Sequence, residues 1–318
     1  MDALHEAALV AARDCMNVQP EETVLIVTDA PCRTIGQALF DVCQELAGEV
    51  MILEMLPREV NGEEPPLLIS EAMKLANVVI CPTSTSLTHT DARRNACKAG
   101  ARVGTMPGIT EDVMIRTMRA DYHQIARLTR RIAEILTNGN IAHITTPAGT
   151  DIEIPIGGIS AIASTGLVTE PGSFGNLPSG EAYLMPVEGK AQGVYVVDGS
   201  LAGIGLITDE PVRITVENGM AVKIEGGTKA KEFEKMVNAV GEKARNLAEL
   251  GVGTNDKAEI KGTVLEDEKV LGTVHLALGN NVSMGGTCNV GFHVDGILKQ
   301  PTLTIDGKTI LKDGKLVL

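Results

Sequence analysis

The first part of the chain alternates between short, continuously apolar runs and longer amphipathic segments. The apolar runs predict buried strands at 23–29, 49–56 and 77–83. The amphipathic segments predict helices at 33–47, 65–76, 91–100 and 120–137, and a further helix with Thr110 as its N-cap. Strands that are apolar on both faces and alternate with helices are typical of a doubly wound parallel sheet.

The pattern changes after Gly139. Between 141 and 226, apolar and polar residues alternate as in antiparallel strands, and the Asn218-Gly219 step indicates a hairpin turn. Apolar residues at spacings of three and four predict one helix over 228–250, and two Asp-Gly steps near the C-terminus predict terminal hairpins. We therefore predict an α/β protein with a parallel-sheet domain over residues 1–139 and a mixed α+β domain over residues 140–318.

Composition narrows the class of protein. Apolar residues make up 44% of the 318 residues but aromatic residues only 2%, so the cores must be aliphatic. The net charge of −13 argues against nucleic acid and against anionic membrane surfaces as partners. The six cysteines form no CxxC pair, and we expect no zinc ribbon and no disulfide framework. The acidic start and the lack of a long apolar stretch favour the cytoplasm.

Candidate metal ligands lie in the last third of the chain. His275 is in the segment HLALG, and His293 and Asp295 are in GFHVDG. Residues i and i+2 of a strand face the same side, so His293 and Asp295 can bind one ion together. Two imidazoles and a carboxylate suit Zn, Mn, Co or Fe better than Ca or Mg. The alternatives are a buried core role for His275 and a simple hydrogen bond between His293 and Asp295.

Other polar residues are weaker candidates. Glu249 is expected at a helix C-terminus, where a nearby cation would offset the unfavourable dipole. Glu181 opens a strand and can face inward, and one member of the acidic run 266–268 can serve as a ligand or general base. His89 follows the third predicted strand, where α/β folds place ligand-binding groups. The alternative for the acidic residues is a solvated position on the surface, and the alternative for His89 is a loop with side-chain caps before the next helix.

Four segments together resemble the thermophilic metallo-aminopeptidases of the aminopeptidase T and aminopeptidase S type, in particular a short branch labelled leucyl aminopeptidase. They are NLPSGE (176–181), ARNLAE (244–249), HLALG (275–279) and HVDG (293–296), in the order of that family. The resemblance implies a homodimer that hydrolyses small peptides with two divalent ions per chain, Zn, Co or Mn. It implies metal ligands at Glu181, Glu249, Glu268, His275, His293 and Asp295, with Glu249 and Glu268 also catalytic and His89 as a substrate-binding candidate.

Two alternatives remain open. The family carries a tyrosine shortly after HLALG, whereas Val282 stands near that position here. The dihydroxypyridine ring-cleaving dioxygenases resemble the same group and use one Fe(II) held by two histidines and an aspartate. His275, His293 and Asp295 supply that set, with His89 as a candidate proton shuttle. The retention of Glu181 and Glu249 favours the aminopeptidase, and a non-catalytic metal-binding relative is the third hypothesis.

Overall fold

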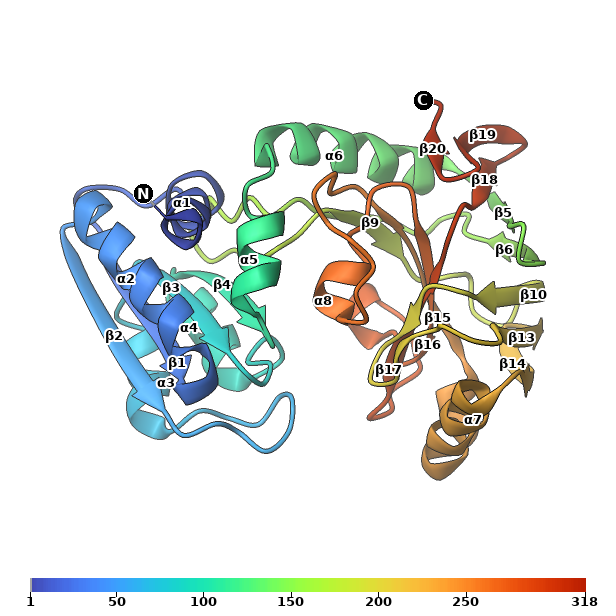
Figure 1. The fold of residues 1–318 in the computed structure, drawn as a ribbon, viewed down its shortest axis with the longest axis horizontal. Coiled ribbons are helices and arrows are strands. Elements are labelled where there is room, and N and C mark those ends of the chain that lie inside the picture. The colour runs from blue at the N-terminus through green and yellow to red at the C-terminus, as the bar shows by residue number, and fades with distance from the viewer. Residues whose placement is uncertain (1) are drawn as a thin grey trace. The chain divides into compact units, whose positions relative to one another are not determined.

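The N-terminal apolar runs form sheet A, a five-stranded parallel sheet with the order β2-β1-β3-β4-β8 (Figure 1). Its strands are β1 (Thr23–Asp29), β2 (Glu49–Met55), β3 (Val78–Thr83), β4 (Arg102–Pro107) and β8 (Phe174–Asn176). β1 and β3 are buried along nearly their whole length, as expected of strands covered on both faces. The predicted parallel sheet is confirmed in the described residues, 2–318.

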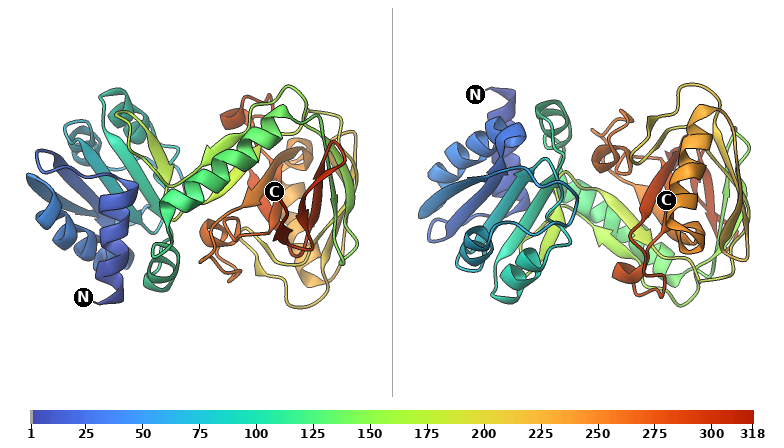
Figure 2. Two further views of the ribbon diagram at one scale, coloured as in Figure 1. Left: turned by 90° about the horizontal axis from the view of Figure 1, so that it is seen from above. Right: turned by 90° about the horizontal axis from the view of Figure 1, so that it is seen from below.

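Helices cover both faces of sheet A (Figure 2). α1 packs on α2 and α5, whereas α3 packs on α4. Thr110 caps α5 as predicted, because its side chain accepts a hydrogen bond from the Val113 N–H. The helical segments of this unit are α1 (Ala3–Leu9), η1 (Val10–Cys15), η2 (Ala30–Cys32), α2 (Arg33–Leu46), α3 (Leu67–Met73), α4 (Asp91–Lys98) and α5 (Glu111–Thr117).

The later strands form two antiparallel sheets, as the alternating pattern predicted. Sheet B has the order β14-β13-β10-β6-β5-β18-β19-β20, and sheet C has the order β12-β11-β17-β16-β15-β9-β7. The strands of sheet B are β5 (Ile141–Thr145), β6 (Asp151–Pro155), β10 (Gln192–Val197), β13 (Val212–Glu217), β14 (Met220–Glu225), β18 (Thr302–Ile305), β19 (Lys308–Lys312) and β20 (Lys315–Leu316). Those of sheet C are β7 (Ile162–Ser164), β9 (Glu181–Leu184), β11 (Ser200–Leu201), β12 (Gly205–Leu206), β15 (Leu247–Gly253), β16 (Val274–Gly279) and β17 (His293–Leu298).

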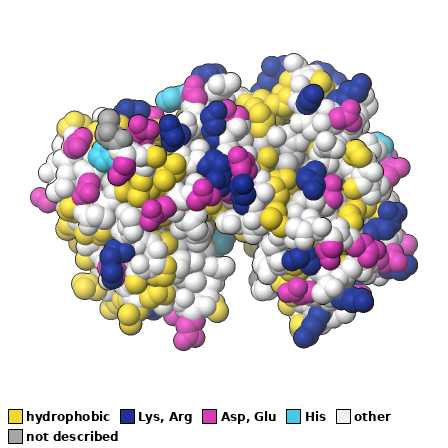
Figure 3. Space-filling model, viewed as in Figure 1, with side chains coloured by type: hydrophobic (Ala, Val, Ile, Leu, Met, Phe, Trp, Pro, Cys, Tyr) yellow, Lys and Arg dark blue, Asp and Glu magenta, His cyan; other side chains and the backbone are white. Residues whose placement is uncertain are grey.

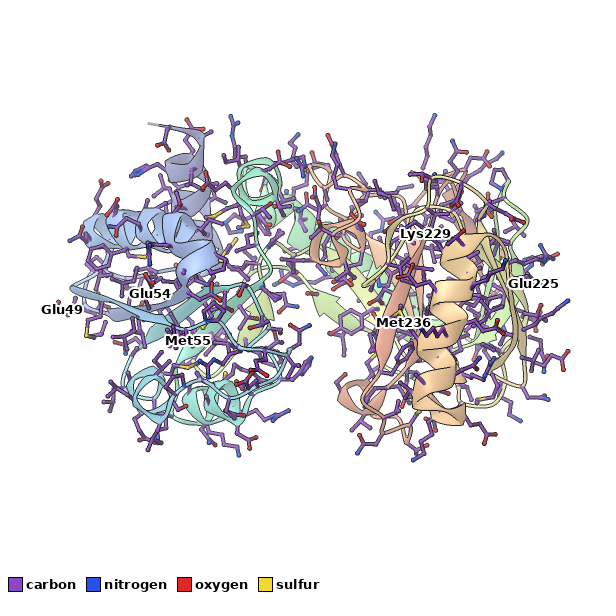
Figure 4. The ribbon with its side chains drawn as sticks, turned by 60° about the horizontal axis from the view of Figure 1, so that its bottom comes forward. Glu49, Glu54, Met55, Glu225, Lys229 and Met236 are labelled. Carbon is purple, nitrogen blue, oxygen red and sulfur yellow. The ribbon has the colours of Figure 1, made fainter. Side chains whose placement is uncertain are left out.

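One apolar core lies between sheets B and C. Ile152 and Ile214 of sheet B belong to the same buried cluster as Leu250 and Leu276 of sheet C. Helix α7 (Thr228–Val240) adds Phe233 to this core, and Figure 4 shows Lys229 and Met236 along the same helix. The remaining helical segments are α6 (Tyr122–Asn138), η3 (Glu242–Arg245), α8 (Val264–Asp267) and η4 (Val282–Met284). The opposite face of sheet C is therefore free to carry polar side chains.

The division of the chain differs from the predicted one at residue 139. The first unit comprises the residues up to Ala126 together with Ser164–Ser179, and the second comprises Arg127–Ala163 and Gly180–Leu318. The boundary falls inside α6, whose continuous amphipathic pattern gave no sign of it. The segment 164–179 returns to the first unit because β8 pairs with β4 at the edge of sheet A.

The predicted helix over 228–250 is wrong in its second half. Helix α7 ends at Val240, and Gly241 follows with a φ of 102°, a backbone conformation that favours glycine. The chain then enters strand β15, so Glu249 lies in a strand and the helix-dipole argument for it does not apply. The predicted hairpins are confirmed at Asn218-Gly219 between β13 and β14, and at both Asp-Gly steps of the C-terminal strands.

None of the helices within residues 2–318 is both long and apolar enough to cross a membrane. Acidic and basic side chains are interspersed on the face shown in Figure 3.

The cysteines are free, and Cys32, Cys43 and Cys81 are buried as small apolar residues, as their positions predicted.

Candidate metal centre

Strand alternation brings most of the predicted ligands to one face of sheet C. Leu250 and Val252 of β15 face the apolar core, so Glu249 and Gly251 face the other side. The pairing register places Ala277 between Glu249 and Asp295, Gly251 opposite His275, and Gly253 opposite Glu181. Because these neighbouring strands turn the same face away from the core, they bring together side chains that are far apart in sequence.

Glu249 lies at the centre of this cluster. Its Oε1 is 3.3 Å from His275 Nε2, and its Oε2 is 3.4 Å from His293 Nε2. Glu181 Oε2 lies 3.4 Å from His275 Nε2, and Asp295 Oδ1 lies 3.6 Å from His293 Nε2. Both imidazoles thus point their Nε2 atoms at one carboxylate.

The cluster contains two groups of possible metal ligands. One group is Glu181, Glu249 and His275, and the other is Glu249, His293 and Asp295; within each, ligand atoms lie within 4.8 Å of one another. Glu249 belongs to both groups. His275 is wholly buried, whereas the side chain of His293 is 34% exposed, so the cluster opens to solvent on the side of His293.

Glycines in β15 allow this close packing. A Cβ atom at Gly251 would lie 2.0 Å from His275 Nε2, so any larger residue would displace the imidazole. A Cβ atom at Gly253 would lie 2.1 Å from the carbonyl oxygen of Val270, the residue after Lys269. Because Gly251 has no side chain, the His275 ring can occupy the space beside it. Because Gly253 has none, the segment that contains Lys269 can approach the sheet.

Lys269 is a buried residue of the cluster that the sequence did not reveal. Its side chain is wholly buried, and its Nζ lies 2.9 Å from Glu181 Oε1 and also donates to Glu268. Burial would lower the pKa of Lys269, but the carboxylates of Glu181 and Glu268 outweigh it and raise the pKa. A lysine beside an acidic run is typical of a solvated surface, which is why the pattern gave no signal.

The acidic run 266–268 divides between two roles. Glu266 accepts a hydrogen bond from the Glu259 N–H, and Asp267 accepts from the backbone N–H groups of Lys261 and Gly262. These two carboxylates organise the preceding loop. Glu268 instead pairs with Lys269 at the cluster. It does not belong to the groups of possible metal ligands among the described residues, so its predicted roles as ligand and catalytic residue stay predictions.

The buried charges of the cluster do not balance. The cluster holds four carboxylates, those of Glu181, Glu249, Glu268 and Asp295, and one ammonium group, that of Lys269, which contacts Glu181 and Glu268. Burying an unpaired charge is costly, and a buried pair needs good partners. With neutral histidines and ionised carboxylates, three negative charges lack a positive partner among these residues. Protons on the two imidazoles and on Glu268 compensate them, and a divalent cation can take the place of two of those protons.

The pKa values show how strongly these groups interact. Burial disfavours the charged form of His275, but its hydrogen bond to Glu249 and the charge of Glu181 raise its pKa to about 9. Burial opposes ionisation of Asp295 too, yet His293 lowers its pKa to about 2. Burial raises the pKa of Glu268 to about 8. Imidazoles that attract protons this strongly also attract metal cations.

The donor set fits a transition-metal ion. His293 Nδ1 lies 2.8 Å from the carbonyl oxygen of Asn280, so Nδ1–H donates to that oxygen and Nε2 keeps its lone pair. Glu181 Oε2 is buried without a hydrogen-bond partner. The Asn280 carbonyl is a second contribution that the sequence could not reveal, because every residue offers the same backbone group.

His89 lies outside this cluster, in the first unit. It is exposed in the turn between β3 and α4. Its predicted contact with substrate stays a prediction. Val282, near the position of the family tyrosine, begins η4 in the second unit and is 46% exposed.

The chain is similar to known dioxygenases. A family model described as NicX: 2,5-dihydroxypyridine 5,6-dioxygenase matches residues 8–318. A 2,5-dihydroxypyridine 5,6-dioxygenase from Pseudomonas putida is 22% identical over 263 residues, which are 79% of this chain and 74% of that protein.

Two solved structures share the fold. The 2,5-dihydroxypyridine dioxygenase from Pseudomonas putida KT2440 has a TM-score of 0.86 and 18% identity, over 100% of this chain and 98% of its own. Wild-type AmpT from Thermus thermophilus has a TM-score of 0.72 and 16% identity, over 99% of each chain. The structural similarity to AmpT supports the resemblance in fold. The predicted metallo-aminopeptidase, a hydrolase, is nevertheless wrong, because the family model and the similar sequence both name an oxygenase.

Proposed function

Because the chain belongs to the NicX family of 2,5-dihydroxypyridine 5,6-dioxygenases, we propose that it is a ring-cleaving dioxygenase with one non-haem ferrous ion. The observation that carries this proposal is the meeting of two imidazoles and an aspartate around one buried carboxylate on sheet C. Two histidines and one carboxylate are the ligand set typical of non-haem Fe(II) oxygenases.

The proposed iron ligands are His275, His293 and Asp295, with the Glu249 carboxylate between the two imidazoles. Iron in such a set supplies the redox chemistry that lets dioxygen react with an aromatic ring, and it keeps coordination positions open. The Asn280 carbonyl holds the proton on His293 Nδ1, and Gly251 leaves space for the His275 ring. The hydrogen bond orients the His293 ring, and the space beside Gly251 admits the His275 ring to the cluster.

The proposed substrate is a pyridine ring that carries hydroxyl groups, by analogy with the similar proteins. In a dioxygenase reaction, both atoms of one O₂ enter the product as the ring bond breaks, and no external reductant is consumed. A ring hydroxyl must also lose a proton. Glu268, whose pKa burial raises to about 8, is one proposed acceptor, and His89 is the other.

The test is anaerobic purification followed by iron analysis and oxygen-uptake measurements with 2,5-dihydroxypyridine. We expect one iron per chain, oxygen consumption, and a product heavier than the substrate by both atoms of O₂. His293→Ala should lose iron and activity together. Iron-loaded wild-type protein that consumes no oxygen with any hydroxylated pyridine would contradict the proposal and favour a non-catalytic metal-binding relative.

A matched control lies in sheet B of the same unit. His143 Nε2 lies 2.8 Å from Asp151 Oδ1, but both side chains are largely exposed. His143→Ala therefore removes a histidine–aspartate pair of the same type without touching the cluster, and iron content and oxygen uptake should not change. The homodimer stays a prediction, which light scattering of the purified protein would test.

A further inference from the structure

Lys269 is a buried cation that is not one of the proposed iron ligands. Its ammonium group contacts Glu181 Oε1 and the Glu268 carboxylate, and its side chain has no exposure to solvent. A lysine side chain is costly to bury, so a residue in this position must compensate an equivalent negative charge. A neutral residue in place of Lys269 would leave these carboxylates without their cation.

The two ligand groups of the cluster differ in their access to Lys269. Within the described part of the chain, Glu249, His293 and Asp295 form no hydrogen bond or ion pair with the ammonium group. Glu181 belongs to the other group and accepts a hydrogen bond from Lys269 through Oε1. Lys269 leaves Glu181 Oε2 without a hydrogen-bond partner, but an ion bound to that oxygen would share the carboxylate with the ammonium group. The like charge of the ammonium group opposes a second ion there, and Glu249 and His275 remain available to the first one.

We propose that the Lys269 ammonium group takes the place of a second divalent cation and so makes this a one-metal centre. The inference rests on the proposed metal centre and adds the residue that decides how many ions it holds. Glu181 Oε2, which is buried, unpaired and 3.4 Å from His275 Nε2, marks the side on which a second ion would bind.

The placement of charge in the cluster supports the same conclusion. Four ionised carboxylates and one ammonium group carry three negative charges, which one divalent ion reduces to one. A second divalent ion would turn this into one positive charge and would lie beside the ammonium group, a like charge that already occupies Glu181 Oε1. Removing the lysine charge instead leaves two divalent ions and four carboxylates in balance.

The test compares metal stoichiometry between wild-type protein and Lys269→Met, which keeps a long side chain but removes its charge. Protein stripped with chelator is titrated with Co²⁺ by calorimetry, and bound cobalt is counted after desalting. We expect one ion per chain in the wild type and two in Lys269→Met. The double variant Lys269→Met/Glu181→Gln should return to one, because it lacks a ligand of the second site.

Lys257→Met is the matched control. Lys257, like Lys269, lies between β15 and β16, but its side chain is 50% exposed and pairs with Asp256. Removing the charge of Lys257 should therefore leave one ion per chain. Two ions in the wild type, one ion in folded Lys269→Met, or two in the double variant would each overturn the inference. A wild type that binds no cobalt would instead contradict the proposed metal centre.

A second variant keeps the inference testable if Lys269→Met does not fold. Glu181→Gln in the otherwise unchanged chain removes a residue that we assign to Lys269 and not to the bound ion. The visible absorption spectrum of the cobalt-loaded protein reports the ligand set, and it should match that of the wild type. A changed spectrum would mean that Glu181 is a ligand of the single ion, and the inference would be wrong.

Discussion

Each of the two units contains a buried cation, and the two cations have different surroundings. In the first unit, Arg102 of β4 makes a two-pronged contact with Glu22, at 2.8 and 2.7 Å. Its remaining donors go to the backbone carbonyl oxygens of Met16 and Asn17. One positive charge thus meets one negative charge, and no carboxylate is left over.

Lys269 in the second unit is surrounded by an excess of negative charge. It contacts two carboxylates, and two more lie in the same cluster beside the imidazoles. A buried ion pair is therefore not by itself a sign of function in this protein. The sign is a cluster whose carboxylates outnumber its fixed cation, because bound protons or a bound metal ion must supply the remaining positive charge.

We expect the largest effect on metal binding from Gly251→Ala in the second unit. The added Cβ atom would lie 2.0 Å from His275 Nε2 and would displace the imidazole from the cluster. We expect metal binding to be lost while the circular dichroism of the sheets is retained. Metal content near the wild-type value in this variant would show that His275 is not a ligand.

Arg102→Met is the counterpart of Lys269→Met in the first unit. It leaves the partly buried Glu22 without its ion-pair partner, which costs roughly 1 to 3 kcal/mol of folding free energy, between the values for exposed and buried pairs. We expect denaturant unfolding to show this loss, with the metal content of the folded protein unchanged. An altered metal stoichiometry would break the distinction between a structural pair and a functional one.

His89→Asn tests whether the first unit contributes only stability. If His89 transfers a proton during the reaction, turnover should fall by about 10²-fold, a typical loss for a general acid or base. Iron content should stay at the wild-type value, because His89 does not belong to the ligand groups. Unchanged turnover would remove His89 from the reaction.

The smallest effect concerns the acid stability of the Arg102–Glu22 pair. Burial opposes ionisation of Glu22, but the hydrogen bonds from Arg102 lower its pKa below the usual 4.5. A lowered pKa in the folded state stabilises the fold above pH 4.5, and this contribution is lost as the pH falls through the folded-state value. Glu22→Gln should therefore flatten the loss of stability below pH 4.5 in acid titrations, relative to wild type.

The errors of the sequence-based interpretation have physical causes. Residues 244–248 keep the helical spacing of α7, but Gly241 ends the helix, and the same apolar residues are buried in the 3-10 helix η3 and in strand β15. The aminopeptidase hypothesis rested on motifs that contain the predicted ligands. These residues meet in the cluster, but they do not specify a reaction, because the same residue types serve hydrolases and oxygenases.

The sequence by itself determined the parallel sheet, the antiparallel sheets and the hairpins, because these depend on local alternation and on turn residues, which are properties of neighbours along the chain. The six candidate residues that the fold brings to one cluster came from the resemblance to the metallo-aminopeptidases. Only the tertiary structure decided that Glu249 lies between two imidazoles, that Gly251 leaves room for one of them, and that Lys269 is buried against Glu181. The balance of charge at one point in space depends on residues far apart in sequence, so local patterns cannot reveal it.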